Sequence, residues 1–552
     1  ILWQYQVPDN SYDTSPKAMS AIYDINGDGR SELIVGSEDD YIRCLNGNSF
    51  SSADTLWESM IGSVYSQLDL SITDDIDNDG HPDIVVGTVW GGRSIFTISA
   101  RTGQTLWQHD TGEYGDGGWV YQVDCRFDYN GDDIIDVLAA TGDDSSGTGP
   151  KRVYCLDGIT GTSIWECPLN GPVFSVIGIE DCTGDGHPDA VAGASNDAET
   201  IGKVVGINGT TGTLLWTFTV EGSSVWALEQ IDDLSGDGIK DVIAGDFVGN
   251  IYGLGTSTGT EIWQNSCGNV IITRFSKLDD VNGDSHPDIM PALLAYGSGH
   301  ITYLIDGFTG QFIWSAYVAD KPAVVEKIED ISWDGINDVV VGTLYTDNNW
   351  YFLDGVDGTV LKSGPYASPV DAITSIPDVV GDTSMELVVG GREGQITYFD
   401  SDGTIDSQEQ NPTWVFEESG SYNVSLTISD GTISDSEVKE DYITVIPIEQ
   451  LLLIGNISGG FFQIKAELMN PSTIEITEVN WSISLNGGFI LAGKQKTGQI
   501  DSIAAGDFSI ITDRPVIGIG KVSVTVKAEV PGMNPITKTA DGFVFLFFII
   551  IR

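Results

Sequence analysis

Eight short acidic segments carry the side chains of this sequence that are best suited to chemistry. They begin at Asp24, Asp75, Asp128, Asp181, Asp233, Asp280, Asp330 and Asp378, and three copies read DINGDGRSE, DIDNDGHPD and DVNGDSHPD. Oxygen-bearing side chains recur at positions 1, 3, 5 and 9 of the nine residues, and glycine at position 6 bends most copies. Ca²⁺ takes 6–8 hard oxygen ligands of this kind. The segments therefore predict a series of calcium-binding loops.

The predicted ligands occupy positions 1, 3, 5, 7 and 9, and position 7 contributes its backbone carbonyl. Position 12, which is acidic in an EF-hand, is apolar in all eight copies, so these loops close their cage at position 9. The alternative is that the segments only form Asx turns at the corners of a sheet. The ligands are Asp24, Asn26, Asp28, Arg30, Glu32, Asp75, Asp77, Asp79, His81, Asp83, Asp128, Asn130, Asp132, Ile134, Asp136, Asp181, Thr183, Asp185, His187, Asp189, Asp233, Ser235, Asp237, Ile239, Asp241, Asp280, Asn282, Asp284, His286, Asp288, Asp330, Ser332, Asp334, Ile336, Asp338, Asp378, Asp382 and Glu386.

The copies differ in the quality of the predicted cage. The second has four carboxylates and is expected to bind best, whereas the eighth has Val380 at position 3 and no glycine at position 6, so it is expected to bind least. We expect about seven or eight Ca²⁺ sites.

The acidic segments are positioned by a repeat of 47 to 53 residues. Each segment leads into a short β-branched strand such as LIVG or IVVG, and a hairpin such as VYCLDGITGTSIW follows. A unit of this length holds the strands of one four-stranded sheet, and such sheets arranged radially form a β-propeller. The sequence predicts an all-β protein with an eight-bladed β-propeller over residues 1–405 and C-terminal immunoglobulin-like β-sandwich modules. The repeated tryptophans of the hairpins are Trp57, Trp107, Trp165, Trp216, Trp263 and Trp314, with Lys362 in the seventh copy.

The eighth repeat lacks its last strand, and the N-terminus offers a replacement. Residues 1–7, ILWQYQV, have Trp3 in the repeat position. We predict that this strand completes the eighth blade and closes the ring. The alternative is an open solenoid of the same units, whose ends would expose sheet edges.

These motifs carry two family resemblances. The acidic loop before an apolar strand resembles the calcium-binding FG-GAP repeat of integrin-α-type propellers, and the tryptophan hairpin resembles the blade motif of quinoprotein (PQQ-dependent) propellers. No bound PQQ is expected, because the tryptophans recur once per blade, as residues that dock blades together do. Residues 411–445 resemble part of a polycystic-kidney-disease (PKD) domain, assigned here to 406–446. Residues 447–552 read as a further β-sandwich similar to those of archaeal surface proteins.

Charge and hydropathy exclude several classes of function. The formal net charge is −56, and a field of that sign repels phosphate backbones, so nucleic-acid binding is excluded. No apolar run reaches the roughly 18–20 residues that span a bilayer. The chain opens without Met, which we interpret as a mature secreted protein. Six cysteines favour an oxidising compartment only mildly.

No sequence motif assigns a catalytic residue, and we predict a protein that is not an enzyme. A ligand site, if formed, is expected in the irregular loops that carry Tyr114, Trp119, Tyr345 and Trp350, where aromatic rings beside carboxylates suit sugar stacking. Trp119 and Trp350 could equally be blade residues. The enzymatic alternative is a calcium-dependent carbohydrate-active enzyme such as a polysaccharide lyase, which would need Lys, Arg, Tyr and Asp in one pocket.

The C-terminal run Phe543–Ile551 contains nine consecutive apolar residues. A strand with one wet face would alternate, so we expect both faces of this run to be covered. Two accounts remain: an internal strand of the last sandwich, or a strand that contacts a neighbouring subunit and yields a homopolymer. The expected function is a secreted or cell-surface, calcium-stabilised structural or adhesion protein, a building block of a filament, sheath or surface layer. Its expected partners are copies of itself, other surface proteins or glycans.

Overall fold

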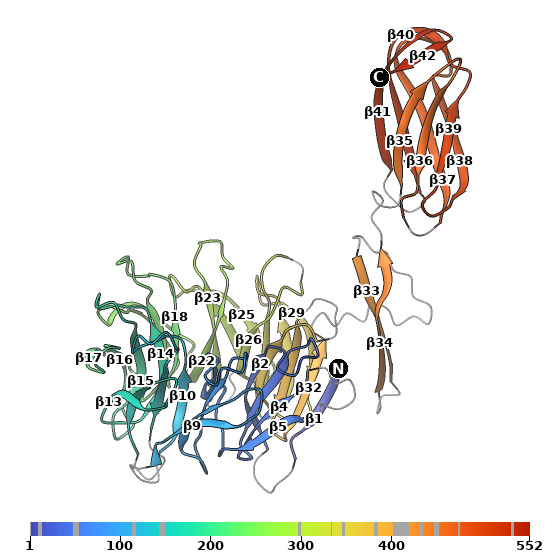
Figure 1. Cartoon of the computed structure of the whole chain (residues 1–552). Coiled ribbons are helices and arrows are strands. Elements are labelled where there is room, and N and C mark those ends of the chain that lie inside the picture. The colour runs from blue at the N-terminus through green and yellow to red at the C-terminus, as the bar shows by residue number, and fades with distance from the viewer. Residues whose placement is uncertain are drawn as a thin grey trace. The chain divides into compact units, whose positions relative to one another are not determined.

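The structure, a computed structural model, is an all-β chain, and the predicted fold class is confirmed. It describes residues 2–8, 14–47, 55–112, 118–142, 149–295, 300–332, 334–344, 348–379, 385–400, 420–429, 434–445, 452–472, 475–530 and 535–552. The chain divides into two compact units, Ile1–Ile405 and Asp406–Arg552 (Figure 1). No helix in the described ranges is both long enough and apolar enough to cross a bilayer.

The first unit contains eight antiparallel sheets of four strands each among its described residues. Blades one to four are β2 (Pro16–Ile22), β3 (Glu32–Ser37), β4 (Tyr41–Leu45) and β5 (Thr55–Met60); β6 (Leu70–Ile72), β7 (Ile84–Gly87), β8 (Ser94–Ile98) and β9 (Thr105–Asp110); β10 (Val120–Asp124), β11 (Val137–Thr141), β12 (Arg152–Leu156) and β13 (Ser163–Pro168); and β14 (Val173–Ile179), β15 (Asp189–Ser195), β16 (Gly202–Ile207) and β17 (Leu214–Thr219).

Blades five to eight repeat this order, and blade eight takes its last strand from the N-terminus. They are β18 (Val225–Gln230), β19 (Val242–Asp246), β20 (Asn250–Gly255) and β21 (Thr260–Ser266); β22 (Val270–Leu278), β23 (Asp288–Ala295), β24 (Ile301–Ile305) and β25 (Phe312–Tyr317); β26 (Lys321–Lys327), β27 (Val339–Leu344), β28 (Asn349–Leu353) and β29 (Val360–Pro365); and β30 (Val370–Ile376), β31 (Glu386–Gly391), β32 (Gln395–Asp400) and β1 (Trp3–Gln6).

The first strands of successive blades contact one another around the whole unit, from β2 through β6, β10, β14, β18, β22 and β26 to β30, and β30 contacts β2 again. The sheets therefore form a closed ring with these strands innermost. A short 3₁₀ helix, η1 (Gln67–Asp69), precedes β6, which is the shortest of the inner strands. Buried Val, Ile and Leu side chains fill the space between adjacent blades, as their β-branched shapes suit a pleated surface.

The ring closes at blade eight, where the sequence predicted that residues 1–7 would lie. β1 pairs antiparallel with β32, with Trp3 opposite Tyr398. The two rings stack with their centroids 3.2 Å apart. Trp3 is buried among residues of blades eight and one, including Met19 and Leu45.

Seven inner strands carry a β-bulge at the same place, near their first residue. In each, one residue is skipped in the pairing with the second strand. A bulge leaves a residue out of the ladder and re-aims its side chain. The skipped residues are Lys17, Tyr121, Phe174, Trp226, Thr273, Ala323 and Asp371.

The second unit contains a strand pair and a β-sandwich. The strand pair is β33 (Gly420–Ser429) with β34 (Ser434–Val445); residues 406–419 of the predicted PKD-like segment lie outside the described residues. The sandwich has a sheet β35-β36-β39 and a sheet β38-β37-β40-β41-β42 that share one core. Its strands are β35 (Leu453–Gly459), β36 (Ile464–Met469), β37 (Ile476–Ala492), β38 (Gln495–Ile503), β39 (Phe508–Asp513), β40 (Ile517–Glu529), β41 (Ile536–Leu546) and β42 (Phe548–Ile551).

The C-terminal apolar run differs from its prediction. It forms parts of two strands, β41 and β42, which turn back on each other so that Phe545 pairs with Phe548. Leu546 makes the turn with a φ of 57°, which no glycine or proline in the run signals. Each strand alternates: Val544 and Ile549 are buried in the core, whereas Phe543, Phe545, Phe548 and Ile550 are exposed. Only one face of the run is thus covered within this chain.

Candidate metal centres and an aromatic cluster

The acidic loops join the first strand of each blade to the second, so all of them lie at one end of the propeller. Seven are described over their ligand positions. In the eighth, Asp378 and Glu386 are described, and Asp382 lies outside the described residues. We refer to this end of the propeller as the loop end.

The first aspartate of each loop organises the turn that follows it. Asp24 accepts hydrogen bonds from the backbone N–H groups of Gly27, Asp28 and Gly29, at 2.6, 3.1 and 2.7 Å. Position 6 is in the left-handed region, at φ 88° in Gly29 and also at φ 68° in Asp133. Glycine adopts this region at little cost. The loop is therefore shaped by its own backbone before any ion binds.

Hydrogen bonds of this kind also favour the ionised form of the first aspartate. The N–H of Gly186 and that of Gly238 lower the pKa of Asp181 and of Asp233, respectively. Both carboxylates are therefore ionised over the whole physiological range, as a ligand to a cation must be.

Two loops bring three carboxylates together. Ligand oxygens of Asp24, Asp28 and Glu32 lie within 4.8 Å of one another, as do those of Asp75, Asp77 and Asp83. Elsewhere in the described part of the chain no other three acidic, His or Cys side chains meet this spacing. An all-oxygen set of this kind suits a hard cation such as Ca²⁺, and the donors fit the predicted ion.

The carboxylate at position 9 is buried and is a structural anchor as well as a candidate ligand. Asp136 accepts hydrogen bonds from the N–H groups of Tyr129 and Asn130 in its own loop and from that of Gly158 in the hairpin of the same blade, the last at 2.9 Å. Burial raises the pKa of Asp136 to about 6, although these bonds lower it. The same cause raises the pKa of Glu32 to about 7 and that of Asp83 to about 6.

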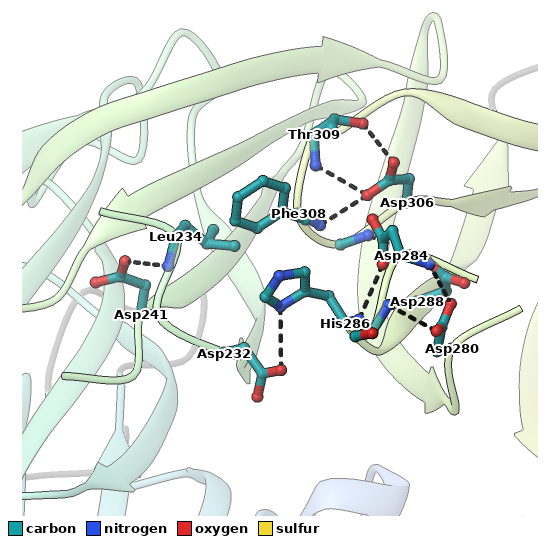
Figure 2. Close-up of polar contacts among 12 residues, drawn as sticks. Asp232, Leu234, Asp241, Asp280, Asp284, His286, Asp288, Asp306, Phe308 and Thr309 are labelled. Carbon is teal, nitrogen blue, oxygen red and sulfur yellow. Dashed lines mark hydrogen bonds and ion pairs between the residues drawn. The ribbon is translucent and has the colours of Figure 1, made fainter. Parts of the chain in front are cut away.

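Position 7 supplies more than its carbonyl. The ring of His286 lies 3.3 Å from a carboxylate oxygen of Asp232 in the preceding blade and stacks on Phe308, with centroids 4.3 Å apart (Figure 2). Arg30 reaches Asp378 of the preceding blade in the same way, with an N–O distance of 3.8 Å. The sequence prediction assigned these residues only a carbonyl, and their side chains join neighbouring loops.

The residue just before position 1 was missed by the sequence prediction. Asp74 accepts a 2.8 Å hydrogen bond from the N–H of Ile135, Glu329 accepts one from Met385, and Glu180 bonds to Lys240, always in the loop of the next blade. Five repeats have an acid at this position, and this recurrence is the signal that could have revealed the link. Hydrogen bonds and ion pairs thus join the loops of several neighbouring blades.

The repeated tryptophans dock each blade on the next. The indole N–H of Trp107 donates to the carbonyl of Gly158 at 2.8 Å, and its ring leaves no room for a side chain at Gly161. Equivalent bonds join Trp57 to Ala100, Trp165 to Gly209, Trp216 to Thr256 and Trp314 to Gly355. Lys362 stands in place of the tryptophan in blade seven. The next blade, blade eight, has no hairpin between its last two strands, because β32 and β1 come from opposite ends of the unit.

Aromatic side chains gather at the end of the propeller opposite the loops. Three come from the bulged positions of adjacent blades, and Tyr121 contacts both Phe174 and Trp226, with centroids 5.0 and 6.1 Å apart. The contacts continue through connecting segments at the same end. We call this set the aromatic cluster, and it comprises Tyr65, Trp90, Trp119, Tyr121, Phe174, Trp226 and Phe247.

The aromatic cluster includes one of the four predicted ligand residues. Trp119 packs against Trp90 at 4.7 Å, and Trp90 is 43% exposed. The indole nitrogens of Trp119 and Trp226 have no hydrogen-bond partner among the described residues. Trp350 is instead a buried residue of β28 that packs on Phe399. Tyr114 and Tyr345 lie outside the described residues.

A cavity of about 600 Å³ lies between η1 and the inner strands of blades six to eight. Arg274, Lys277, Lys327, Glu326 and Glu329 line it, and Arg274 donates to the carbonyl of Val325 at 2.7 Å. The described lining contains no Tyr or Asp. The converging Lys, Arg, Tyr and Asp set that would favour the polysaccharide lyase alternative is thus not found in this described lining.

The six cysteines are free thiols, and five of them are buried. Burial raises the pKa of Cys167 to about 11 and that of Cys267 to about 12. Buried thiols of this kind are unreactive and serve as small apolar side chains.

Two repeat families match parts of the chain. The FG-GAP-like repeat family matches residues 24–86, and the family of the outer membrane protein assembly factor BamB matches residues 92–290. No curated protein matches the chain. The two matches agree with the two motifs of the repeat and support a propeller.

Several solved structures of low sequence identity are similar to this chain. Sqt1 of Saccharomyces cerevisiae is 12% identical with a TM-score of 0.53, over 72% of this chain and 98% of Sqt1. The V. cholerae biofilm matrix protein Bap1 is 14% identical with a TM-score of 0.49, over 72% of this chain and 90% of Bap1. BamB from Moraxella catarrhalis is 14% identical with a TM-score of 0.40, over 70% of this chain and 98% of that one. At such identities the likeness to Sqt1 supports the fold alone.

Proposed function

We propose that this protein is a calcium-stabilised structural or adhesion protein of the cell surface or extracellular space. The observation that supports this proposal most strongly is the presence of two three-carboxylate groups in loops that repeat around one end of a closed propeller. The groups are Asp24, Asp28 and Glu32, and Asp75, Asp77 and Asp83. The match to the FG-GAP-like repeat family supports the same assignment. The proposal includes no catalytic step, and PQQ is not part of it.

In this proposal, calcium fastens the loop end of the propeller. The ion replaces repulsion between grouped carboxylates by attraction, and hydrogen bonds already join the loops of blades two and three and those of blades seven and eight. Extracellular modules bind Ca²⁺ with Kd of about 10⁻⁴–10⁻³ M. At about 10 mM Ca²⁺ each occupied site then adds roughly 1.4–2.7 kcal/mol by mass action. Several sites together exceed the net stability of a typical domain.

The test is a thermal melt of the full chain with and without a calcium chelator. We expect a large fall in the melting temperature on chelation, restored by Ca²⁺ but not by Mg²⁺. Asp77→Asn should reduce the gain that Ca²⁺ confers. Asp110→Asn, which changes the same charge on the outer strand of the same blade, should not. An unchanged melt in excess chelator would contradict the proposal.

A second candidate function, glycan binding, is favoured by the aromatic cluster. Aromatic faces stack on the apolar faces of sugar rings, and Trp90 offers an exposed ring that is held in place by its contact with Trp119. A net charge of −56 repels polyanions, so the expected ligand is a neutral glycan.

Glycan binding is tested with neutral hexasaccharides of glucose and of N-acetylglucosamine. Trp90→Ala should abolish binding measured by calorimetry, whereas Tyr317→Ala, at an exposed aromatic residue on the outer strand β25, should leave it unchanged. Equal binding by both variants would remove the aromatic cluster as the site.

A further inference from the structure

The C-terminal sandwich exposes an apolar row on each of its two outer faces. On the five-stranded sheet, four residues directly opposite one another on adjacent strands form row A: Phe489, Ile519, Phe545 and Phe548. On the three-stranded sheet, Leu453, Met469 and Phe508 form row B in the same manner. Every member of row A is at least 49% exposed, and every member of row B at least 39%.

The residues of the two rows are separate from the residues that form the core. Strand alternation places their neighbours inward, so that Val544 and Ile549 next to row A, and Leu468 next to row B, are buried in the core shared by the two sheets. Because the sheets pack through that core, rows A and B lie on opposite faces of the sandwich. Apolar patches that a chain leaves exposed in this way mark interaction surfaces.

Charge identifies the kind of partner. The part of the chain from 452 to 552 holds eight basic and eight acidic side chains, so it is formally neutral, and the net charge of −56 lies in the residues before it. The sandwich is therefore the one region in which two copies can approach without strong mutual repulsion. Beside row A stands Lys521, which pairs with Phe543, and beside row B stands Glu467, opposite Ile510.

The rows also match in size. Adjacent strands lie about 4.8 Å apart, so row A spans about 14 Å across four strands and row B about 10 Å across three. Row A of one copy is therefore wide enough to cover row B of another, and the residues beside the two rows, Lys521 and Glu467, have opposite charges. Contact between different patches is heterologous, and because these patches lie on opposite faces it favours extension into a fibre over closure into a two-fold dimer.

We infer that the partner of this surface is a second copy of the chain, bound head-to-tail with row A on row B. This inference deepens the proposed function, since it rests on the role as a building block and names the partner and the contact. It also selects, of the two accounts of the C-terminal run, the one in which Phe543–Ile551 contacts a neighbouring subunit.

The experiment compares single charge insertions in the full chain by analytical ultracentrifugation and negative-stain electron microscopy in Ca²⁺. Phe545→Lys acts on row A and Phe508→Lys on row B, at residues that are 56% and 54% exposed. Thr537→Lys is the control, on the same strand as Phe545 but about 26 Å along it. We expect wild type and the control to form species that lengthen with concentration, and each row variant alone to be monomeric.

Mixing the two row variants gives the decisive result. Each retains the row that the other lacks, so an equimolar mixture should form one-to-one pairs that cannot extend. Assembly of Phe508→Lys as well as wild type would show row A binding row A and overturn the inference. A monomeric wild type would overturn it too, as would a monomer that binds phosphatidylcholine vesicles through Phe545. None of these results changes the calcium-dependent melt, which tests the proposed function separately.

Discussion

Trp107 of blade two and Asp136 of blade three bond to the same residue, Gly158: the indole N–H donates to its carbonyl at 2.8 Å, and the carboxylate accepts from its N–H at 2.9 Å. The two signatures of the repeat are thereby linked. The same arrangement joins Trp57 and Asp83 through Ala100, and Trp216 and Asp241 through Thr256. In blades two to five and in blade seven, the candidate metal loop thus shares an anchor with the docking of the previous blade.

Removal of an indole N–H should lower the free energy of unfolding where that N–H donates a hydrogen bond. Trp107→Phe leaves the buried carbonyl of Gly158 without its donor, which costs about 1–3 kcal/mol. Trp263→Phe removes the same ring area, but the nitrogen of Trp263 has no hydrogen-bond partner among the described residues. Urea unfolding should therefore show the larger loss for Trp107→Phe; equal losses would assign the whole effect to packing.

Position 9 should support the loop even without an ion. Asp241→Asn places an amide donor against the N–H of Thr256 or of Ser235, both of which the carboxylate now accepts. In chelator we expect a loss of about 1–3 kcal/mol in the free energy of unfolding. Asp237→Asn, at exposed position 5, should change stability only in Ca²⁺. If the two variants behaved alike in chelator, position 9 would have no anchoring role.

We expect that the N-terminal strand can be deleted and then supplied again as a separate peptide. A chain without residues 1–7 leaves β32 with an unpaired edge and removes the stacking of Trp3 on Tyr398. We expect oligomers or a lower melting temperature for the truncated chain, and recovery when a peptide of residues 1–7 is added. A truncated chain that is monomeric with the wild-type melt would show that β1 is dispensable.

Asp69 should make stability depend on pH. Burial raises its pKa to about 8, although hydrogen bonds from Ser66 and Tyr65 lower it. The folded state then binds a proton that the unfolded state releases above about pH 4, so stability falls as the pH rises from about 4 to 8, by up to about 1.4 kcal/mol per pH unit. Asp69→Asn mimics the neutral acid. It should match wild type at about pH 3 and melt higher at pH 9, and a variant that melts lower at both would refute this account.

The parts of the fold that follow from short-range turn chemistry could be predicted from the sequence. The loop that starts at Asp24 and the hairpin that ends at Trp107 recur in nearly the same form in most repeats, so the copies support one another. The anchoring of Asp136 on Gly158 and the bond between Asp74 and Ile135 could not be predicted, because they join segments 22 and 61 residues apart. The hairpin at Leu546 was missed because a leucine makes the turn.

The pairing of the N-terminal strand β1 with β32 in blade eight affects how the propeller bears mechanical force. The polypeptide leaves the propeller after β32 and continues through β33 and β34 to the sandwich, so tension applied through a fibre of sandwiches would enter the ring along β32. β32 is hydrogen-bonded on both sides, to β31 and to β1, and the load is divided between two rows of bonds. The N-terminal strand therefore adds a second row of hydrogen bonds that holds β32 against pulling.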